Sequence, residues 1–291
     1  MAEPETGSTS AASRTLRVGL LQMCSSRDEA ENVATVTGMA REAAAAGARY
    51  LQTPEFTSLM EMSRKRLFEA THPEEGNRAL AAFRDLAREL GVWLHIGSMG
   101  VLVRPDKIAN RSFLIGPDGE IRARYDKIHM FDAAVGGRDN FRESKNFEAG
   151  DRAVVADMDG IGLGLSVCYD LRFPGLYRAL AHGGAQVLAV PSAFTRQTGE
   201  AHWHTLVKAR AIDQGAWVLA AAQGGNHACG RETYGHSLIV SPWGEVVAEG
   251  GVHPSVIVAD IELGAVAETR ARLPSLEHDR PFEVARTGRP A

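Results

Sequence analysis

Short apolar segments alternate with longer amphipathic ones along most of this chain. Residues 15–23, TLRVGLLQM, have the length and apolar composition of a buried strand, and residues 28–48 have helical spacing with a glycine near their end. The same order returns as a strand over residues 49–56, a helix over residues 77–91 and a strand over residues 92–99. Repeated strand-helix units predict a fold with sheets inside and helices outside.

Glycine-containing turns divide other apolar runs into antiparallel pairs. Gly119, Gly160 and Gly244 each follow a turn-forming or aromatic residue between two such runs. Between these hairpins, the helix-then-strand order resumes, over residues 175–184 and 185–194, and again over residues 201–215 and 216–223. Because hairpins break the strict alternation that a TIM barrel requires, we predict an α/β protein built as a four-layer α-β-β-α sandwich.

The chain shows no internal repeat, low-complexity linker or change of composition that would divide it. We therefore expect a frayed tail over residues 1–14, a single domain over residues 15–268 and an irregular C-terminal arm over residues 269–291. The arm is rich in Pro, Arg and Asp, and we expect it to pack on a neighbouring subunit. Gly136 and Gly137 predict a mobile loop.

Composition and charge narrow the class of partner. The chain is 44% hydrophobic and 23% charged with a formal net charge of -4, which is typical of a globular protein and gives no electrostatic reason to expect nucleic acid. The spacing of Cys24, Cys168 and Cys229 suits neither a disulfide framework nor a zinc motif. Without an export signal or a long apolar run, we expect a cytoplasmic protein that binds a small molecule, with no membrane partner.

Cys168 combines a reactive side chain with an unusual position. The apolar residues 161–167 predict a strand before it, and Pro174 opens a predicted helix after it, so the thiol lies at a strand-to-helix turn where a nucleophile can be presented. Position alone is weak support, because cysteine is often buried and inert.

A nucleophilic thiol needs a base and an electrostatic clamp, and two stretches offer them. Glu55 follows the predicted strand over residues 50–53, and Lys127 follows the hairpin strand that ends at Tyr125. Either residue alone would more often be a solvated surface charge.

Taken together, the stretches LQTPEF, RYDKIHMFD and GLGLSVCYDLRFPGLYRAL resemble the nitrilase, or carbon-nitrogen hydrolase, superfamily, in which a Glu, a Lys and a Cys occur in this order. The resemblance runs from VGLLQM to LPSLEHDRP, and GEAHWHTLVKARAI, AAAQGGNH and YGHSLIVSPWG look most like its Nit branch, which includes deaminated glutathione amidases and ω-amidases. It implies the sandwich fold, an amidase without metal or organic cofactor, and at least a homodimer.

The resemblance also implies roles for the three residues. Glu55 would take the proton of the Cys168 thiol, which would attack an amide carbon, while Lys127 and the backbone N–H of Tyr169 stabilise the oxyanion. Ammonia would leave, and Glu55 would then activate the water that hydrolyses the thioester.

Five further residues are candidates for supporting roles. Glu143 would hold Lys127 in place, unless it is a loop carboxylate paired with Arg142. Arg172 would bind a substrate carboxylate, unless it forms a salt bridge with Asp170, which would itself brace the turn.

Ser192 and Phe194 follow a predicted strand and could line the pocket. His129 is expected to organise the lysine loop rather than to transfer protons.

Other functional classes fit less well. A papain-like pair could use His129 or His236, but no papain signature surrounds Cys168. GLSVC is not GxSxG, and GIGLGLS lacks the third glycine of a dinucleotide-binding motif. His202 and His204 are two positions apart on a predicted helix and point in different directions, which argues against a metal site.

Two alternatives stay open on the sequence. An N-carbamoyl-amino-acid hydrolase would use the same three residues and release carbon dioxide together with ammonia. A catalytically silent scaffold would keep the fold without any chemical need for Glu55, Lys127 and Cys168.

Overall fold

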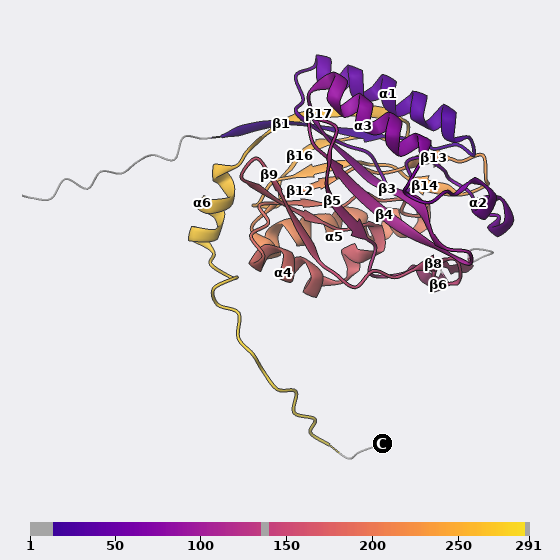
Figure 1. Ribbon diagram of the computed structural model, residues 1–291. Helices are drawn as coiled ribbons and strands as arrows, with labels where there is room; N and C mark the ends of the chain where they lie inside the picture. Colours follow the sequence, from indigo (N-terminus) through magenta and orange to yellow (C-terminus); the bar gives the residue numbers. More distant parts are fainter. Residues whose placement is uncertain (1–13, 135–139, 289–291) are drawn as a thin grey trace, which may run out of the picture.

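Two β-sheets pack face to face in the computed structural model, which describes residues 14–134 and 140–288 (Figure 1). Helices cover the outer face of each sheet, so the predicted four-layer α-β-β-α sandwich is confirmed. Gly136 and Gly137, where we expected a mobile loop, lie outside the described residues, as does the expected tail apart from Arg14.

The first sheet has the strand order β17-β1-β2-β3-β4-β5, with β8 paired to β4. Strands β1, β2 and β3 are parallel, and β17 closes the sheet antiparallel to β1. Helices α1 and α3 lie on its outer face. The bounds are β1 (Thr15–Gln22), α1 (Glu29–Ala45), β2 (Tyr50–Gln52), α3 (Arg78–Leu90), β3 (Trp93–Arg104), β4 (Lys107–Ile115), β5 (Ile121–Asp126), β8 (Phe147–Glu148) and β17 (Ser255–Glu262).

The second sheet has the strand order β16-β15-β12-β11-β10-β9. Its central strands β10, β11 and β12 are parallel, and helices α4 and α5 cover its outer face. The bounds are β9 (Val154–Met158), β10 (Ile161–Leu165), α4 (Pro174–His182), β11 (Val187–Ala189), α5 (Arg196–Gln214), β12 (Trp217–Ala220), β15 (Leu238–Val240) and β16 (Val246–Glu249).

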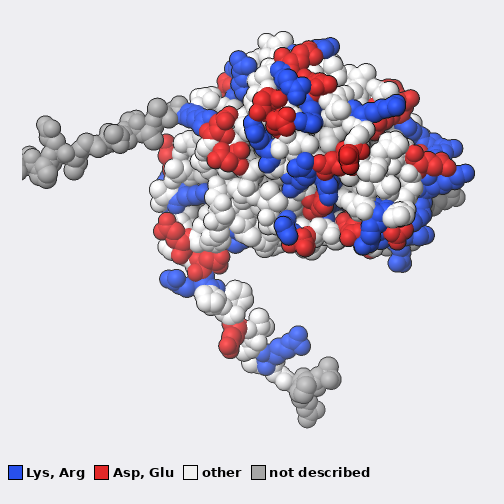
Figure 2. Space-filling model, viewed as in Figure 1, with Lys and Arg blue, Asp and Glu red and all other residues white. Residues whose placement is uncertain are grey.

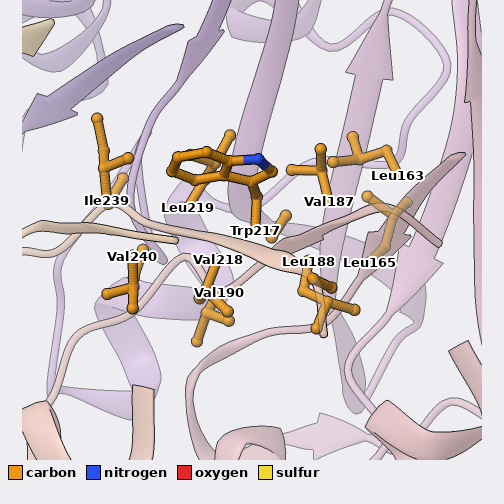
Figure 3. Packing of buried hydrophobic residues seen from close by; sticks show 14 of the residues in the cluster. Leu163, Leu165, Val187, Leu188, Val190, Trp217, Val218, Leu219, Ile239 and Val240 are labelled. Atoms are coloured by element: carbon orange, nitrogen blue, oxygen red, sulfur yellow. The ribbon is translucent and has the colours of Figure 1, made fainter. Parts of the chain in front are cut away.

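The central strands read as continuous apolar runs because both of their faces are buried. In β1, Leu20 packs into the core between the sheets, whereas the next residue, Leu21, packs under the helices α1 and α3. Figure 3 shows the same alternation in the second sheet, where Trp217 and Leu219 point to one side and Val218 to the other.

All three predicted hairpins are confirmed. Strands β4 and β5, β9 and β10, and β15 and β16 are antiparallel pairs. Gly119, Gly160 and Gly244 have φ values of 79°, 84° and 88° at their turns, a backbone conformation that glycine adopts without a steric penalty.

The remaining elements were not predicted. Helix α6 continues to Arg272, past the expected domain end at residue 268. Residues 273–288 contain no helix or strand and run away from the body of the molecule (Figure 1). The elements are α2 (Arg64–Ala70), β6 (Asp132–Ala134), β7 (Asn140–Arg142), the 3₁₀ helices η1 (Glu143–Lys145) and η2 (Cys168–Arg172), β13 (Gly224–Asn226), β14 (Glu232–Tyr234) and α6 (Gly264–Arg272).

Acidic and basic side chains are interspersed over the surface seen in Figure 2, rather than gathered into areas of one sign. No helix in the described part of the chain combines the length and apolarity that crossing a bilayer demands.

Candidate active site

Chain segments that leave strands of both sheets meet at one cavity. Glu55 follows β2 and Lys127 follows β5 in the first sheet, and Cys168 follows β10 in the second. All three line a cavity of about 430 Å³. The layered fold therefore brings together three residues that are far apart in the sequence.

Lys127 lies at the centre of this group and is 1% exposed. Its Nζ donates to Glu55 Oε1 at 2.8 Å and to the two carboxylate oxygens of Glu143 at 3.0 and 2.8 Å. The expected contact between Glu143 and Lys127 is therefore present, and Glu143 is not paired with Arg142. Glu143 Oε2 also accepts from the backbone N–H of Phe131 at 2.6 Å.

Two further donors hold Glu55. Asn110 Nδ2 donates to Glu55 Oε1 at 3.0 Å and to Glu143 Oε1 at 3.1 Å, so one amide bridges both carboxylates. The backbone N–H of Ala193 donates to the other oxygen of Glu55 at 3.0 Å. The carboxylate is thus fixed in one orientation, and its charge contributes to raising the pKa of the Cys168 thiol.

The electrostatic surroundings give each group a definite charge. Burial alone would raise the pKa of Glu55, but the nearby cations Lys127 and Arg231 outweigh it and lower that pKa. Burial raises the pKa of the Cys168 thiol well above its usual value, and the Glu55 carboxylate adds to the rise. Burial opposes the charge of Lys127, but Glu143 and Glu55 outweigh it and raise its pKa. At neutral pH the resting site holds a carboxylate, an ammonium and a protonated thiol.

Cys168 occupies a constrained backbone position at the start of η2. Its φ is 50°, which is uncommon for a residue with a side chain and concentrates at functional sites. Its N–H donates to Pro191 O at 2.9 Å. Asp170, expected to brace this turn, accepts from the backbone N–H of Val167 at 2.9 Å and from the Tyr125 hydroxyl at 2.7 Å.

His129 lies on the other side of Asp170. Its backbone N–H donates to Asp170 Oδ1 at 3.0 Å, its Nδ1 lies 2.7 Å from the same oxygen, and its ring stacks on Phe173. These contacts join the segment after Lys127 to the turn that carries Cys168.

Tyr169, Arg172 and Phe194 line the cavity, as expected for pocket residues. The Arg172 guanidinium lies 5.4 Å from the ring centroid of Phe194 and 5.9 Å from that of Tyr169. Its Nη2 lies 3.3 Å from His202 Nδ1. Asp170 pairs with His129 instead of Arg172. Ser192 is buried outside the cavity wall, and its hydroxyl donates to Val190 O at 3.1 Å, so it does not line the pocket as we expected.

Arg231 and Asn110 were missed by the sequence analysis. Arg231 lines the cavity, and its guanidinium lies 5.5 Å from the ring centroid of Phe141. Its Nε is buried without a hydrogen-bond partner in the described part of the chain. Neither residue follows an apolar strand at a turn, the signal that singled out Cys168, and only the tertiary fold brings them to the site.

A family model and several known proteins match most of this chain. The family model described as carbon-nitrogen hydrolase matches residues 17–271. A deaminated glutathione amidase of Yersinia enterocolitica is 39% identical over 266 residues, which cover 90% of this chain and 92% of that protein. The omega-amidase NIT2 of Homo sapiens is 34% identical over 269 residues, covering 91% and 95%.

A solved structure adds a comparison in three dimensions. It is an amidase of Nesterenkonia sp. in which acrylamide has added to the active-site cysteine. It superimposes with a TM-score of 0.74 at 28% identity, covering 89% of this chain and 98% of that one. The sequence similarity covers nearly the whole length of both relatives and the fold is shared. The chain therefore belongs to the carbon-nitrogen hydrolase family.

Proposed function

We propose that this carbon-nitrogen hydrolase is a cysteine-dependent amidase that acts on deaminated glutathione or a related ω-amide. The observation that carries the proposal is a buried Cys168 thiol in the wall of the same cavity as the Glu55 carboxylate, which is paired at 2.8 Å with the Lys127 ammonium. The proposed substrates are those named for relatives at 34–39% identity.

Acylation would begin when Glu55 takes the thiol proton of Cys168. The sulfur then bonds to the amide carbon, and the carbonyl oxygen becomes an oxyanion. Lys127 supplies a positive charge close to it, and the backbone N–H of Tyr169, in the first turn of η2, supplies a donor. Lys127 donates to both carboxylate oxygens of Glu143. One of these two hydrogen bonds is enough to keep the Lys127–Glu143 ion pair, so the other N–H of Lys127 can turn to the oxyanion.

Deacylation would use the same carboxylate. Glu55 gives its proton to the leaving nitrogen as the carbon–nitrogen bond breaks, which leaves a thioester on Cys168 and an ionised Glu55. The carboxylate then takes a proton from water, the hydroxide oxygen bonds to the thioester carbon, and the thiol is regenerated with a product acid. Glu143 and Asn110 would keep Lys127 and Glu55 aligned through both half-reactions.

Two guanidinium groups support recognition of a carboxylate-bearing substrate. Arg172 and Arg231 both line the cavity, and neither forms an ion pair with a carboxylate in the described part of the chain. Planar guanidinium groups suit bidentate binding of carboxylates. Deaminated glutathione has two carboxylates, one on its oxo-acid end and one on its glycine end, whereas a simple ω-amide of an oxo acid has one.

The leaving group distinguishes these substrates and refines our expectation of ammonia release. A primary ω-amide releases ammonia. Deaminated glutathione has no primary amide, because its acyl group is bonded to the nitrogen of cysteine. Its hydrolysis at that bond would release the dipeptide cysteinylglycine and an oxo acid, with the Glu55 proton passing to the dipeptide amine.

The test is product analysis with three substrates: deaminated glutathione, α-ketoglutaramate and an N-carbamoyl amino acid. Oxo acid, cysteinylglycine and ammonia are quantified separately, with the Cys168→Ala protein as the blank. We expect oxo acid and cysteinylglycine without ammonia from the first substrate. Preference for α-ketoglutaramate would identify an ω-amidase, and carbon dioxide with ammonia would identify a carbamoyl hydrolase.

If none of the three substrates is hydrolysed, the protein is treated with an electrophilic amide analogue to test whether Cys168 is a nucleophile. A covalent adduct at Cys168 would then support Cys168 as the nucleophile, while the proposed substrates would be wrong. Complete absence of an adduct would remove the proposed chemistry and favour the catalytically silent scaffold.

We also propose that the chain forms at least a homodimer in which the C-terminal arm packs on a neighbouring subunit. The arm's apolar side chains support this: Phe282 is 86% exposed and Val284 is 80% exposed in the single chain. Isolated side chains of this kind gain free energy when they are buried against a partner.

A further inference from the structure

Three potential metal ligands lie together outside the cavity: His204, His236 and Glu249. Glu249 Oε1 lies 2.9 Å from His204 Nε2 and 2.7 Å from His236 Nδ1. One ligand atom from each of the three side chains lies within 4.8 Å of the other two. None of these residues lines the catalytic cavity.

The three side chains come from different elements. His204 lies on α5, Glu249 ends β16, and His236 lies in the segment between β14 and β15. His202 and His204 do point in different directions, as their spacing predicts: His202 contacts Arg172, whereas His204 turns to Glu249. The spacing alone excluded a shared metal for the two histidines, but it could not reveal the ligands that the fold brings to His204.

His236 is held firmly in its position. Its φ of 54° is unusual for a residue with a side chain. Its N–H donates to Gly251 O at 2.8 Å, and its carbonyl oxygen accepts from Trp203 Nε1 at 2.7 Å. Its ring stacks on Tyr234 with centroids 4.3 Å apart. Backbone and ring are thus constrained from several sides, as expected where a side chain must be aimed.

We propose that His204, His236 and Glu249 form a binding site for a divalent transition-metal ion, with zinc as the favoured ion. Two imidazoles and one carboxylate are a donor set that zinc and its neighbours prefer over magnesium or calcium. The Glu249 oxygen already lies at distances from both nitrogens close to the spacing of ligand atoms around one ion. The side chains of His204 and Glu249 are 36% and 37% exposed, so solvent can reach the site and supply the remaining ligands.

The ion would replace two hydrogen-bonding protons by coordinate bonds. At present each imidazole is placed to share a proton with Glu249 Oε1, and the same nitrogen lone pairs would face the ion once those protons have left. Because the ligands join α5 to β16 and to the segment before β15, bound metal would fasten helix α5 to the second sheet.

The test is zinc titration of the full chain by isothermal calorimetry after treatment with a chelator. The matched control is His182→Ala, because His182 also pairs with a carboxylate, that of Asp279 at 3.4 Å, but has no third ligand within residues 14–134 and 140–288. We expect wild type and His182→Ala to bind zinc alike. His204→Ala and Glu249→Gln should each weaken binding by at least about tenfold, the smallest effect usual even for residues that only support ligands.

Cobalt(II) separates this site from the free cysteines. Bound to nitrogen and oxygen ligands, cobalt should give visible ligand-field bands without a sulfur-to-metal charge-transfer band, and both variants should lose those bands. Zinc should also raise the thermal unfolding midpoint of wild type but not that of Glu249→Gln, while unchanged circular dichroism shows that the variant is folded. Absence of zinc binding by wild type, or zinc affinity equal to that of wild type in the folded variants Glu249→Gln and His204→Ala, would overturn the proposal.

Discussion

At the residue scale, the site depends on Glu55 being a base with a fixed orientation. Glu55→Gln keeps the size of the side chain and removes its charge. We expect kcat for the amide substrate to fall by about 10²–10⁴-fold, the range for loss of a general base, with initial rates of oxo-acid formation as the measurement. Glu143→Gln is the matched control and should lose less, because Glu143 contacts Lys127 rather than the thiol. An unchanged kcat in Glu55→Gln would mean that another group deprotonates Cys168.

The lowered pKa of Glu55 also predicts how stability depends on pH. Burial opposes ionisation, but Lys127 and Arg231 outweigh it, so the folded protein holds this proton less tightly than the unfolded chain does. The carboxylate therefore stabilises the fold above its unfolded pKa of about 4.3, and this contribution is lost as the pH falls through the lowered folded value.

Urea unfolding from neutral to acidic pH measures this effect. Wild type should lose free energy of unfolding as the pH falls below about 4.3, and Glu55→Gln should lose less over the same range. Glu283→Gln, at an exposed position of the arm, should follow the wild-type curve. Parallel curves for Glu55→Gln and wild type would contradict the linkage.

Among single residues, the sequence was informative where chemistry and position coincide. Cys168, Glu55 and Lys127 each follow a strand and occur in distinctive local sequence, so they could be predicted. Arg231 follows no such strand, and its role in the pocket depends on Phe141 and Ala193, which are remote in sequence. Ser192 is adjacent to the cavity residues Ala193 and Phe194, but its hydroxyl bonds Val190 O instead. Local sequence could not tell which of these adjacent side chains reach the cavity.

At the element scale, Gly97 allows β3 to approach the segment that carries Glu55 and also Pro191, whose carbonyl oxygen accepts from the Cys168 N–H. A Cβ atom at position 97 would overlap Thr53 O, Pro54 O and the side chain of Pro191. Since the overlap is largely with backbone, the strands would have to separate. Gly97→Ala should reduce the free energy of unfolding by about 1–3 kcal/mol or more, and it should lower kcat by displacing Glu55 from the thiol.

Gly38→Ala is the control for this substitution. Gly38 lies inside α1, and a Cβ there meets no heavy atom within 4 Å. Alanine in a helix interior should raise the free energy of unfolding by about 0.5–1 kcal/mol and leave kcat unchanged. Denaturant unfolding and initial rates on both variants check the pair. Wild-type stability in Gly97→Ala would show that the sheets can move apart at this point without cost.

Helices and strands could be predicted where residues close together in the sequence determine them. Apolar runs, helical spacing and turn glycines identified most strands of both sheets and all three hairpins. Strand β17 was missed, although it pairs with β1 along its whole length, because it is close to β1 only after more than 230 intervening residues have folded. The short pairs β6–β7 and β13–β14 were also missed, because they lack the apolar runs that surround the equally short β2, β11 and β15.

At the scale of the whole molecule, the C-terminal arm is the segment that the single chain leaves least explained. It extends from the end of α6 (Figure 1). Its large apolar side chains, Leu273, Phe282 and Val284, are exposed to solvent. A chain gains little by ordering such a segment alone, because the conformational entropy lost is not offset by burial. Contact with a second copy would supply the missing burial.

A homodimer held together by the arm should respond to the loss of the arm's apolar side chains. Light scattering coupled to size exclusion should give at least a dimer for the full chain and a lower average mass for the double variant Phe282→Ser/Val284→Ser. Glu283→Ser, between these two positions, alters the arm without removing apolar area and should leave the mass unchanged. Since α6 and both sheets precede the arm, circular dichroism should be the same for all three proteins. A strictly monomeric full chain would exclude the homodimer, whereas a dimer insensitive to the double variant would place the interface elsewhere on the sandwich.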